Sequence, residues 1–156
     1  ACMDALRSAG LDAVALGVIE RGTPFLGICV GMQMLFEGSE ESPEATGLGV
    51  LPGVSRLLPA GVKRPQMQWN LLERRGDPAL LATAPHEAWA YFVHSFAADT
   101  DDSIVSSTCD YGGPVVASVE SGSVWATQFH PEKSSTTGLA ALGAFVAWAE
   151  STAGEV

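Results

Sequence analysis

One cysteine in this chain stands between two glycines, in the run from Gly27 to Gly31. An apolar segment precedes the run and a helix-like pattern follows it, which predicts a strand, a sharp turn and a helix. This is the layout of the nucleophile elbow G-x-S-x-G, with sulfur in place of oxygen. The free N–H groups and the dipole of a helix N-terminus favour a thiolate. Cys29 is therefore the candidate nucleophile.

A nucleophilic thiol needs a base, and the base needs a partner that orients it. Of the three histidines, only His130 is followed by a carboxylate at a useful spacing, in His130-Pro131-Glu132. Pro131 fixes one backbone φ angle between the two side chains. Residues 124–129 are expected to form a strand, so the pair would lie at a strand end, where open α/β sheets bind ligands. Cys29, His130 and Glu132 form a candidate catalytic triad.

Each of these residues also has a plainer explanation. A lone cysteine is usually a buried structural thiol, and His130 and Glu132 could be a packed histidine and a surface acid. The flanking glycines and the Pro-Glu pair favour the catalytic interpretation. Cys2 and Cys109 lack metal or redox spacing and are expected to be inert, and His94 is expected to be structural.

Composition restricts the class of protein. The chain has 156 residues, 47% of them hydrophobic and 17% charged, which indicates one globular domain. Its net charge of −10 argues against nucleic acid or an anionic membrane as a partner. No apolar run is long enough to span a membrane. An odd number of cysteines, three, favours a reduced, cytoplasmic setting.

Hydrophobic patterning predicts helices early and late in the chain and strands between them. Together these indicate an α/β fold with an antiparallel part. Residues 1–150 are expected to form the domain, and 151–156 a C-terminal tail. The predicted helices are 2–9, 12–20, 32–37 and 137–150; the predicted strands are 24–28, 54–58, 66–72, 88–93, 104–109, 115–120 and 124–129.

The elbow, with Gln33 one turn after Cys29, and the distal His-Pro-Glu together resemble class I (triad-type) glutamine amidotransferases. Other stretches resemble the glutaminase subunits of imidazole glycerol phosphate synthases, and the similarity runs from the first residue to about Glu150. These stretches are residues 32–37, 47–49, 65–70, 91–95 and 129–134.

The resemblance implies an open mixed, mostly parallel sheet with flanking helices, of the flavodoxin-like kind. Members of the family begin with additional strands and a Gly-rich loop that supplies oxyanion-stabilising N–H groups. This chain opens after that loop, so its N-terminal strands are expected to be missing and its activity alone to be low. Gln66 and Gln68 replace the His and Gly usual in the family.

The resemblance also assigns roles to individual residues. Gln33, Glu41, Ser95 and Phe96 would bind the substrate, and the amide of Val30 would stabilise the oxyanion. Glu41 could equally be a solvated acid. The residues that would face a partner subunit are Trp69, Asn70, Tyr91 and Lys133.

The function implied is hydrolysis of glutamine to glutamate and ammonia, with ammonia passed to a cyclase barrel subunit in histidine biosynthesis. Such a protein would work as a heterodimer and need no cofactor or metal. Two other classes remain open. One is another triad-type amidotransferase or cysteine hydrolase, and the other is a non-catalytic binding module.

Overall fold

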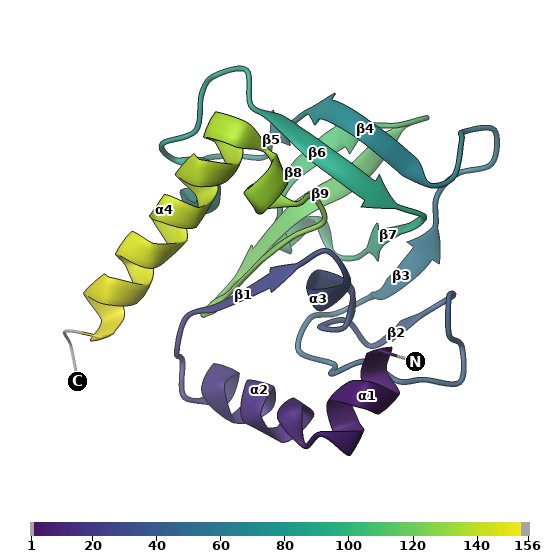
Figure 1. Ribbon diagram of the computed structural model, residues 1–156, viewed down its shortest axis with the longest axis vertical. Helices are drawn as coiled ribbons and strands as arrows, with labels where there is room; N and C mark the ends of the chain where they lie inside the picture. The colour runs from purple at the N-terminus through teal and green to yellow at the C-terminus, as the bar shows by residue number, and fades with distance from the viewer. Residues whose placement is uncertain (1, 154–156) are drawn as a thin grey trace.

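Helices lie at the two ends of the chain and strands fill the region between them (Figure 1). The structure is a computed structural model and describes residues 2–153. In chain order the elements are α1 (Cys2–Ser8), α2 (Leu11–Glu20), β1 (Phe25–Ile28), α3 (Val30–Gln33), β2 (Gly38–Ser39), β3 (Val54–Leu57), β4 (Gln66–Leu71), β5 (Glu73–Arg74), η1 (Ala79–Leu81), β6 (Trp89–His94), β7 (Phe96–Asp99), η2 (Asp102–Ile104), β8 (Val105–Asp110), β9 (Pro114–Ser121), β10 (Val124–Thr127), η3 (Pro131–Lys133) and α4 (Ser135–Ala153).

The strands of the described residues pair into three sheets, ordered β1-β10-β9-β8-β5, β2-β3-β7 and β4-β6. Only β1 with β10 and β2 with β3 are parallel, so the expectation of a mostly parallel sheet is wrong. The physical reason is the short connections between the later strands. Glycines with positive φ, at 112, 113 and 122, turn β8 into β9 and β9 into β10. Such short turns can join antiparallel strands only, because parallel strands need a long crossover.

The helix after the elbow is shorter than predicted, since α3 covers Val30–Gln33 rather than 32–37. The carbonyl groups at its C-terminal end accept hydrogen bonds from a loop that returns to the helix, instead of from a further helical turn. Leu48 donates to the Met34 carbonyl at 2.8 Å, and Val50 donates to the Leu35 carbonyl at 2.9 Å. The elbow therefore rests on the loop that follows it.

Two apolar clusters form the core. One packs α4 and η1 against the inner strands, and in it Trp125 of β10 stacks on Trp148 of α4 with 4.3 Å between ring centroids. The other lies under α3 and holds the fully buried Met32 and Phe36. The two clusters thus support β1 and β10 together with the segments that follow them. No helix within residues 2–153 has the length and apolar character needed to cross a membrane.

Helix α4 packs closely on the η3 segment, which follows β10. A Cβ added at Gly138 would lie 1.8 Å from the Pro131 carbonyl oxygen, so only glycine allows this approach. The helix continues through Ala153. The domain limits 1–150 and 151–156 stay a prediction.

We expect Gly138→Ala to lower the free energy of unfolding by about 1–3 kcal/mol, because the added methyl must push α4 away from η3. Gly143, in the same helix, is the matched control, since a Cβ there meets nothing within 4 Å. Gly143→Ala should raise stability by about 0.5–1 kcal/mol. Urea unfolding of both variants measures the difference, and equal effects would contradict the packing described.

Candidate active site

Cys29 lies in a strained backbone turn between β1 and α3. Its φ of 52° and ψ of −110° belong to a region that side-chain-bearing residues rarely adopt. A Cβ on Gly27 would approach a Leu35 methyl to 2.9 Å and the Met32 amide nitrogen to 3.1 Å. A close approach that requires glycine therefore occurs at Gly27. It does not occur at Gly31, where a Cβ would meet nothing within 4 Å.

Parallel pairing brings the triad segments to one edge of the sheet. Ile28 of β1 is in register with Thr127 of β10, and the Cys29 amide continues the ladder by donating to the Thr127 carbonyl at 2.7 Å. Cys29 and the segment from Gln128 to His130 leave the ends of adjacent parallel strands at this point. The predicted site at a strand end is thus formed by β1 and β10.

His130 and Glu132 form the expected imidazole–carboxylate pair, with 2.7 Å between Nδ1 and Oε1. Nδ1 therefore carries the proton, and Nε2 has a free lone pair. Nε2 is buried and has no hydrogen-bond partner in the described part of the chain. No hydrogen bond joins it to Cys29 among residues 2–153, so the imidazole is oriented by Glu132 but is not bonded to the thiol.

The Cys29 thiol is half-buried, and burial raises its pKa above the ordinary value. A hydrogen bond from the backbone N–H of Val30 lowers the pKa, the negative charge of Glu132 raises it, and a hydrogen bond from the Gln128 amide lowers it. The net direction is upward. At neutral pH the thiol is thus protonated in the free protein, and a base must remove its proton.

Gln33 is joined to the thiol through a second glutamine. Its Nε2 donates to the Phe96 carbonyl at 2.8 Å and to Oε1 of Gln128 at 2.9 Å. Nε2 of Gln128 in turn lies 3.7 Å from the Cys29 sulfur. The carbonyl of Ser95 accepts from Leu58 at 2.9 Å, so the carbonyl oxygens of both Ser95 and Phe96 are already bonded within the protein.

A pocket of about 170 Å³ adjoins the elbow. Its walls include Val30, Gln33 and Glu41, which are three of the residues expected to contact the substrate or its oxyanion. Cys2 of α1 also lines it, in a place where no role was expected. The structure therefore brings the elbow helix and the Glu41 loop to the same pocket.

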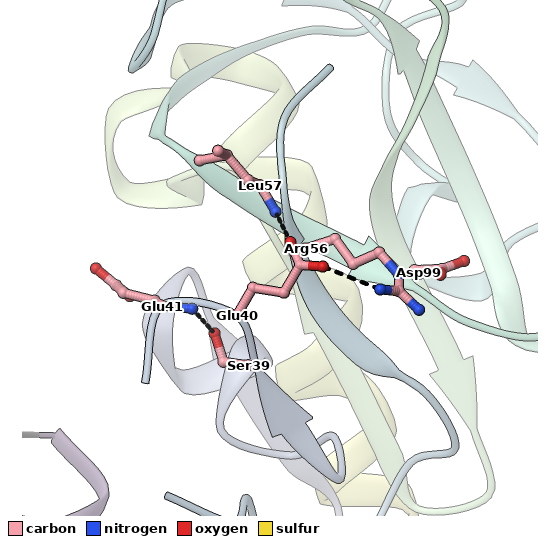
Figure 2. A network of polar contacts seen from close by, with 6 residues as sticks. All are labelled: Ser39, Glu40, Glu41, Arg56, Leu57 and Asp99. Carbon is pink, nitrogen blue, oxygen red and sulfur yellow. Dashed lines mark hydrogen bonds and ion pairs between the residues drawn. The ribbon is translucent and has the colours of Figure 1, made fainter. Parts of the chain in front are cut away.

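An exposed ion-pair network supports the loop that carries Glu41 (Figure 2). Glu40 pairs with Arg56 at 2.9 Å and accepts from the Leu57 amide at 2.9 Å, while Arg56 also pairs with Asp99 at 2.5 Å. In Figure 2 the Glu41 side chain points away from this network. Glu40 is thus tied to β3, and the neighbouring carboxylate of Glu41 is left for the pocket.

The four residues predicted to face a partner subunit differ in their contacts within the protein. Trp69 is 45% exposed and packs edge-on against Tyr91, with 6.0 Å between ring centroids. Asn70 instead donates to the Asp110 carbonyl at 2.9 Å. Lys133 is exposed on η3. The aromatic pair is part of an exposed apolar face of β4 and β6 that also includes Met67, Leu71 and Trp89.

Cys109 and His94, which were expected to have no catalytic role, are both buried. Cys109 is fully buried, and burial raises the pKa of its thiol to about 11. Burial lowers the pKa of His94, whose Nδ1 bonds the Phe96 carbonyl at 2.8 Å. Among residues 2–153 no group of three or more His, Cys, Asp or Glu side chains could hold a metal ion.

Sequence reasoning missed two residues of the site. Gln128 contacts both Cys29 and Gln33, and the Ser134 hydroxyl donates to the His130 carbonyl at 2.6 Å. One signal was available for Gln128, since it is a polar residue near the end of the predicted strand 124–129 and two residues before His130. Nothing in the sequence indicated the partners of Ser134.

Backbone strain at the elbow can be tested by stability. We expect Cys29→Gly to be about 1 kcal/mol more stable than Cys29→Ala, because only glycine adopts this φ without strain. Cys109, in strand β8, is the control: there the glycine variant should be less stable than the alanine variant. Urea unfolding measures all four variants. The same order at both positions would rule out strain as the cause.

Comparison with known proteins identifies relatives that are 45–46% identical to this chain. The chain is 45% identical over 146 residues to "Imidazole glycerol phosphate synthase subunit HisH" of Deinococcus radiodurans, covering 92% of this chain and 68% of that protein. Proteins of the same name from Desulfitobacterium hafniense and Methanothermobacter thermautotrophicus are each 46% identical. The matches cover 94% and 88% of this chain and 70% and 69% of those proteins.

Solved structures share the fold at lower identity. A crystal structure of a glutamine amidotransferase matches with a TM-score of 0.69 at 22% identity, covering 95% of this chain and 72% of the other. A glutamine amidotransferase from Thermotoga maritima matches with a TM-score of 0.60 at 19% identity, covering 92% of this chain and 56% of the other. The family described as "Glutamine amidotransferase class-I" matches residues 9–146. Together with the close relatives, this match shows that the chain belongs to the class-I glutamine amidotransferases.

Proposed function

We propose that the chain is the glutaminase subunit of an imidazole glycerol phosphate synthase, which hydrolyses glutamine and passes ammonia to a cyclase subunit for histidine biosynthesis. The relatives at 45–46% identity carry the name of that subunit. The observation that supports the chemistry is the meeting of the strained Cys29 elbow and the His130–Glu132 pair at one sheet edge. A glutaminase assay, with and without a cyclase subunit, tests the proposal.

In the first half-reaction, Nε2 of His130 takes the thiol proton and the Cys29 sulfur attacks the carbonyl carbon of the glutamine side chain. The resulting oxyanion accepts from the Val30 amide at the start of α3. Glu132 holds the imidazole in the tautomer that leaves Nε2 free and stabilises the imidazolium once it forms. When the tetrahedral species collapses, His130 donates the proton to the leaving nitrogen, the carbon–nitrogen bond breaks, ammonia leaves, and the glutamyl thioester of Cys29 remains.

In the second half-reaction, water attacks the thioester while His130 accepts one of its protons. The carbon–sulfur bond then breaks, His130 returns the proton to the Cys29 sulfur, and glutamate is released. The overall change is glutamine plus water to glutamate plus ammonia. Because burial keeps the Cys29 thiol protonated in the free protein, the proton transfer to His130 is an essential step.

Substrate recognition follows from the pocket. Both N–H groups of the Gln33 amide are used within the protein, so its Oε1 remains to accept from the amide N–H₂ of the substrate. Glu41 presents a carboxylate at the same pocket, which suits the α-ammonium group of glutamine. Arg56, through Glu40, would keep the Glu41 loop in place.

The apolar face of β4 and β6 is the proposed contact with the cyclase subunit. Exposed aromatic residues are enriched where partner surfaces contribute most to affinity. Tyr91 also bonds the triad segment directly, because its carbonyl accepts from the His130 amide at 3.0 Å and its amide donates to the Ser134 hydroxyl at 2.9 Å. A partner seated on this face would therefore press on the backbone that carries the base.

We expect Cys29→Ala to abolish glutaminase activity and His130→Ala to lower kcat by roughly a hundredfold to ten-thousandfold, the usual contribution of a general base. Glu132→Ala should cost less. Because the three act as a unit, the His130→Ala, Glu132→Ala double variant should fall well short of the product of the two single losses. A steady-state double-mutant cycle measures this coupling, and simple multiplication of the losses would show independent action.

The partner face can be tested with a substitution far from the thiol. We expect Trp69→Ser to weaken binding of the cyclase subunit by about 2 kcal/mol, or roughly thirtyfold in Kd, since a central aromatic anchor is lost. Leu139→Ser on α4 removes an apolar side chain that is more exposed than Trp69 and belongs to another element, and it should leave Kd unchanged. Calorimetry with the purified subunits gives both values. An unaltered Kd for Trp69→Ser would exclude this face as the contact.

A further inference from the structure

We infer that Gln128 is a positioning residue that joins the nucleophile to the substrate-reading glutamine, donating its amide N–H to the Cys29 sulfur and fixing the carboxamide of Gln33 through its own Oε1. The inference rests on the proposed function and deepens it. Gln128 follows β10 directly, is fully buried, and has both ends of its carboxamide bonded to site residues.

The orientation of both carboxamides follows from a single carbonyl group. The Phe96 oxygen can only accept, so the Gln33 atom 2.8 Å from it must be Nε2. Nε2 of Gln33 is then the donor to Gln128 at 2.9 Å, so the Gln128 atom at that contact must be Oε1. The other end of Gln128, 3.7 Å from the Cys29 sulfur, is therefore the N–H₂ group. Neither amide can flip without placing two donors or two acceptors face to face.

These hydrogen bonds determine which atom of the Gln33 carboxamide is available to the substrate. Gln33, which lines the pocket, donates one N–H to Phe96 and the other to Gln128, so Oε1 is the acceptor that remains for a substrate. The Phe96 oxygen also accepts from Nδ1 of His94, so both of its lone pairs are occupied. Gln128 thus helps to hold Gln33 in the orientation that accepts from an amide N–H₂ group.

For Cys29, the Gln128 amide adds a second donor to the sulfur beside the Val30 backbone N–H. A hydrogen bond to a charged group is stronger than one to a neutral group, so the contact tightens as the thiolate forms. The hydrogen bond from Gln128 lowers the pKa of the thiol, whereas the negative charge of Glu132, on η3, raises it. The other titratable groups here are the imidazoles of His130 and His94, and the charge of His130 contributes to lowering the pKa of His94.

Two substitutions separate the two contacts. Gln128→Glu keeps the size and an oxygen that accepts from Gln33, but replaces the donor to sulfur with a carboxylate oxygen. Gln128→Met keeps the approximate volume and removes both contacts. Gln66→Met is the matched control, because Gln66 is also fully buried and its Nε2 lies 3.8 Å from a cysteine sulfur, that of Cys109, which the proposed reaction does not use.

The first measurement is the pH dependence of Cys29 alkylation by iodoacetamide in the full chain, followed by mass spectrometry. Both Gln128 variants should move the inflection to higher pH, and Gln66→Met should leave it where the unsubstituted protein has it. The second measurement is glutaminase kinetics with the cyclase subunit present. Gln128→Glu should lower kcat by about tenfold or more, the effect of one hydrogen bond to a charged group, with little change in KM. Gln128→Met should also raise KM.

An alkylation profile in which both Gln128 variants match the unsubstituted protein would overturn the inference, as would equal losses of kcat in Gln128→Met and Gln66→Met. A variant that fails to fold shows itself in urea unfolding, and the remaining Gln128 variant then decides by the same two readouts. Failure of the proposed function looks different, since the unsubstituted protein with its partner would then not hydrolyse glutamine. The alkylation profiles would still test the contact between Gln128 and Cys29.

Discussion

The parallel pairing of β1 with β10 brings together two segments that are 99 residues apart at Cys29 and Gln128. The candidate site residues directly follow the two strands: Cys29 follows β1, and Gln128 and His130 follow β10. A shift of the register by one residue would turn the side chains of one strand to the other face of the sheet. The bond from the Cys29 amide to the Thr127 carbonyl extends the ladder one residue past β1 and fixes the elbow against its partner strand. The orientation of the triad thus depends on backbone hydrogen bonds before any side chain contributes.

At this edge of the sheet, opposing effects act on the pKa of the Cys29 thiol. Burial and the nearby carboxylate of Glu132 favour the neutral thiol, whereas the Val30 N–H and the Gln128 amide favour the thiolate. Because the first group prevails, the pKa of the thiol is raised, and a protonated thiol reacts more slowly with oxidants and alkylating agents. Glu132 is needed to hold His130 even though its charge disfavours the thiolate. The donors at the sulfur, among them the buried Gln128 amide, offset part of that effect.

The sequence was sufficient for features that depend on local patterns. The elbow and the spacing of His130 and Glu132 are short-range signals, and the structure has a strand, a turn and a helix at the elbow and an ion pair between His130 and Glu132. The parallel-sheet expectation failed because it came from the resemblance, while the short turns of residues 110–123 require antiparallel neighbours. The contacts of Gln128 could not be predicted, since its partners Cys29 and Gln33 are 99 and 95 residues away. Such pairs depend on the sheet register, and local periodicity carries no information about it.

The backbone of Tyr91 adds a further constraint on the base. In β6 its side chain packs with Trp69 on the exposed face, while its carbonyl and amide bond His130 and Ser134. Ser134 closes the link, because its hydroxyl also donates to the His130 carbonyl. A displacement of β6 by a bound partner would therefore act directly on the His130 backbone, whereas the Cys29 amide is bonded to Thr127, at the end of the strand that precedes His130. Since Nε2 of His130 has no hydrogen bond to the thiol in this structure, a small movement of that backbone is enough to change the distance over which the proton must pass. The aromatic pair is thus linked through β6 to the backbone of the candidate base, while the candidate nucleophile is linked to the same segment through Thr127 of β10.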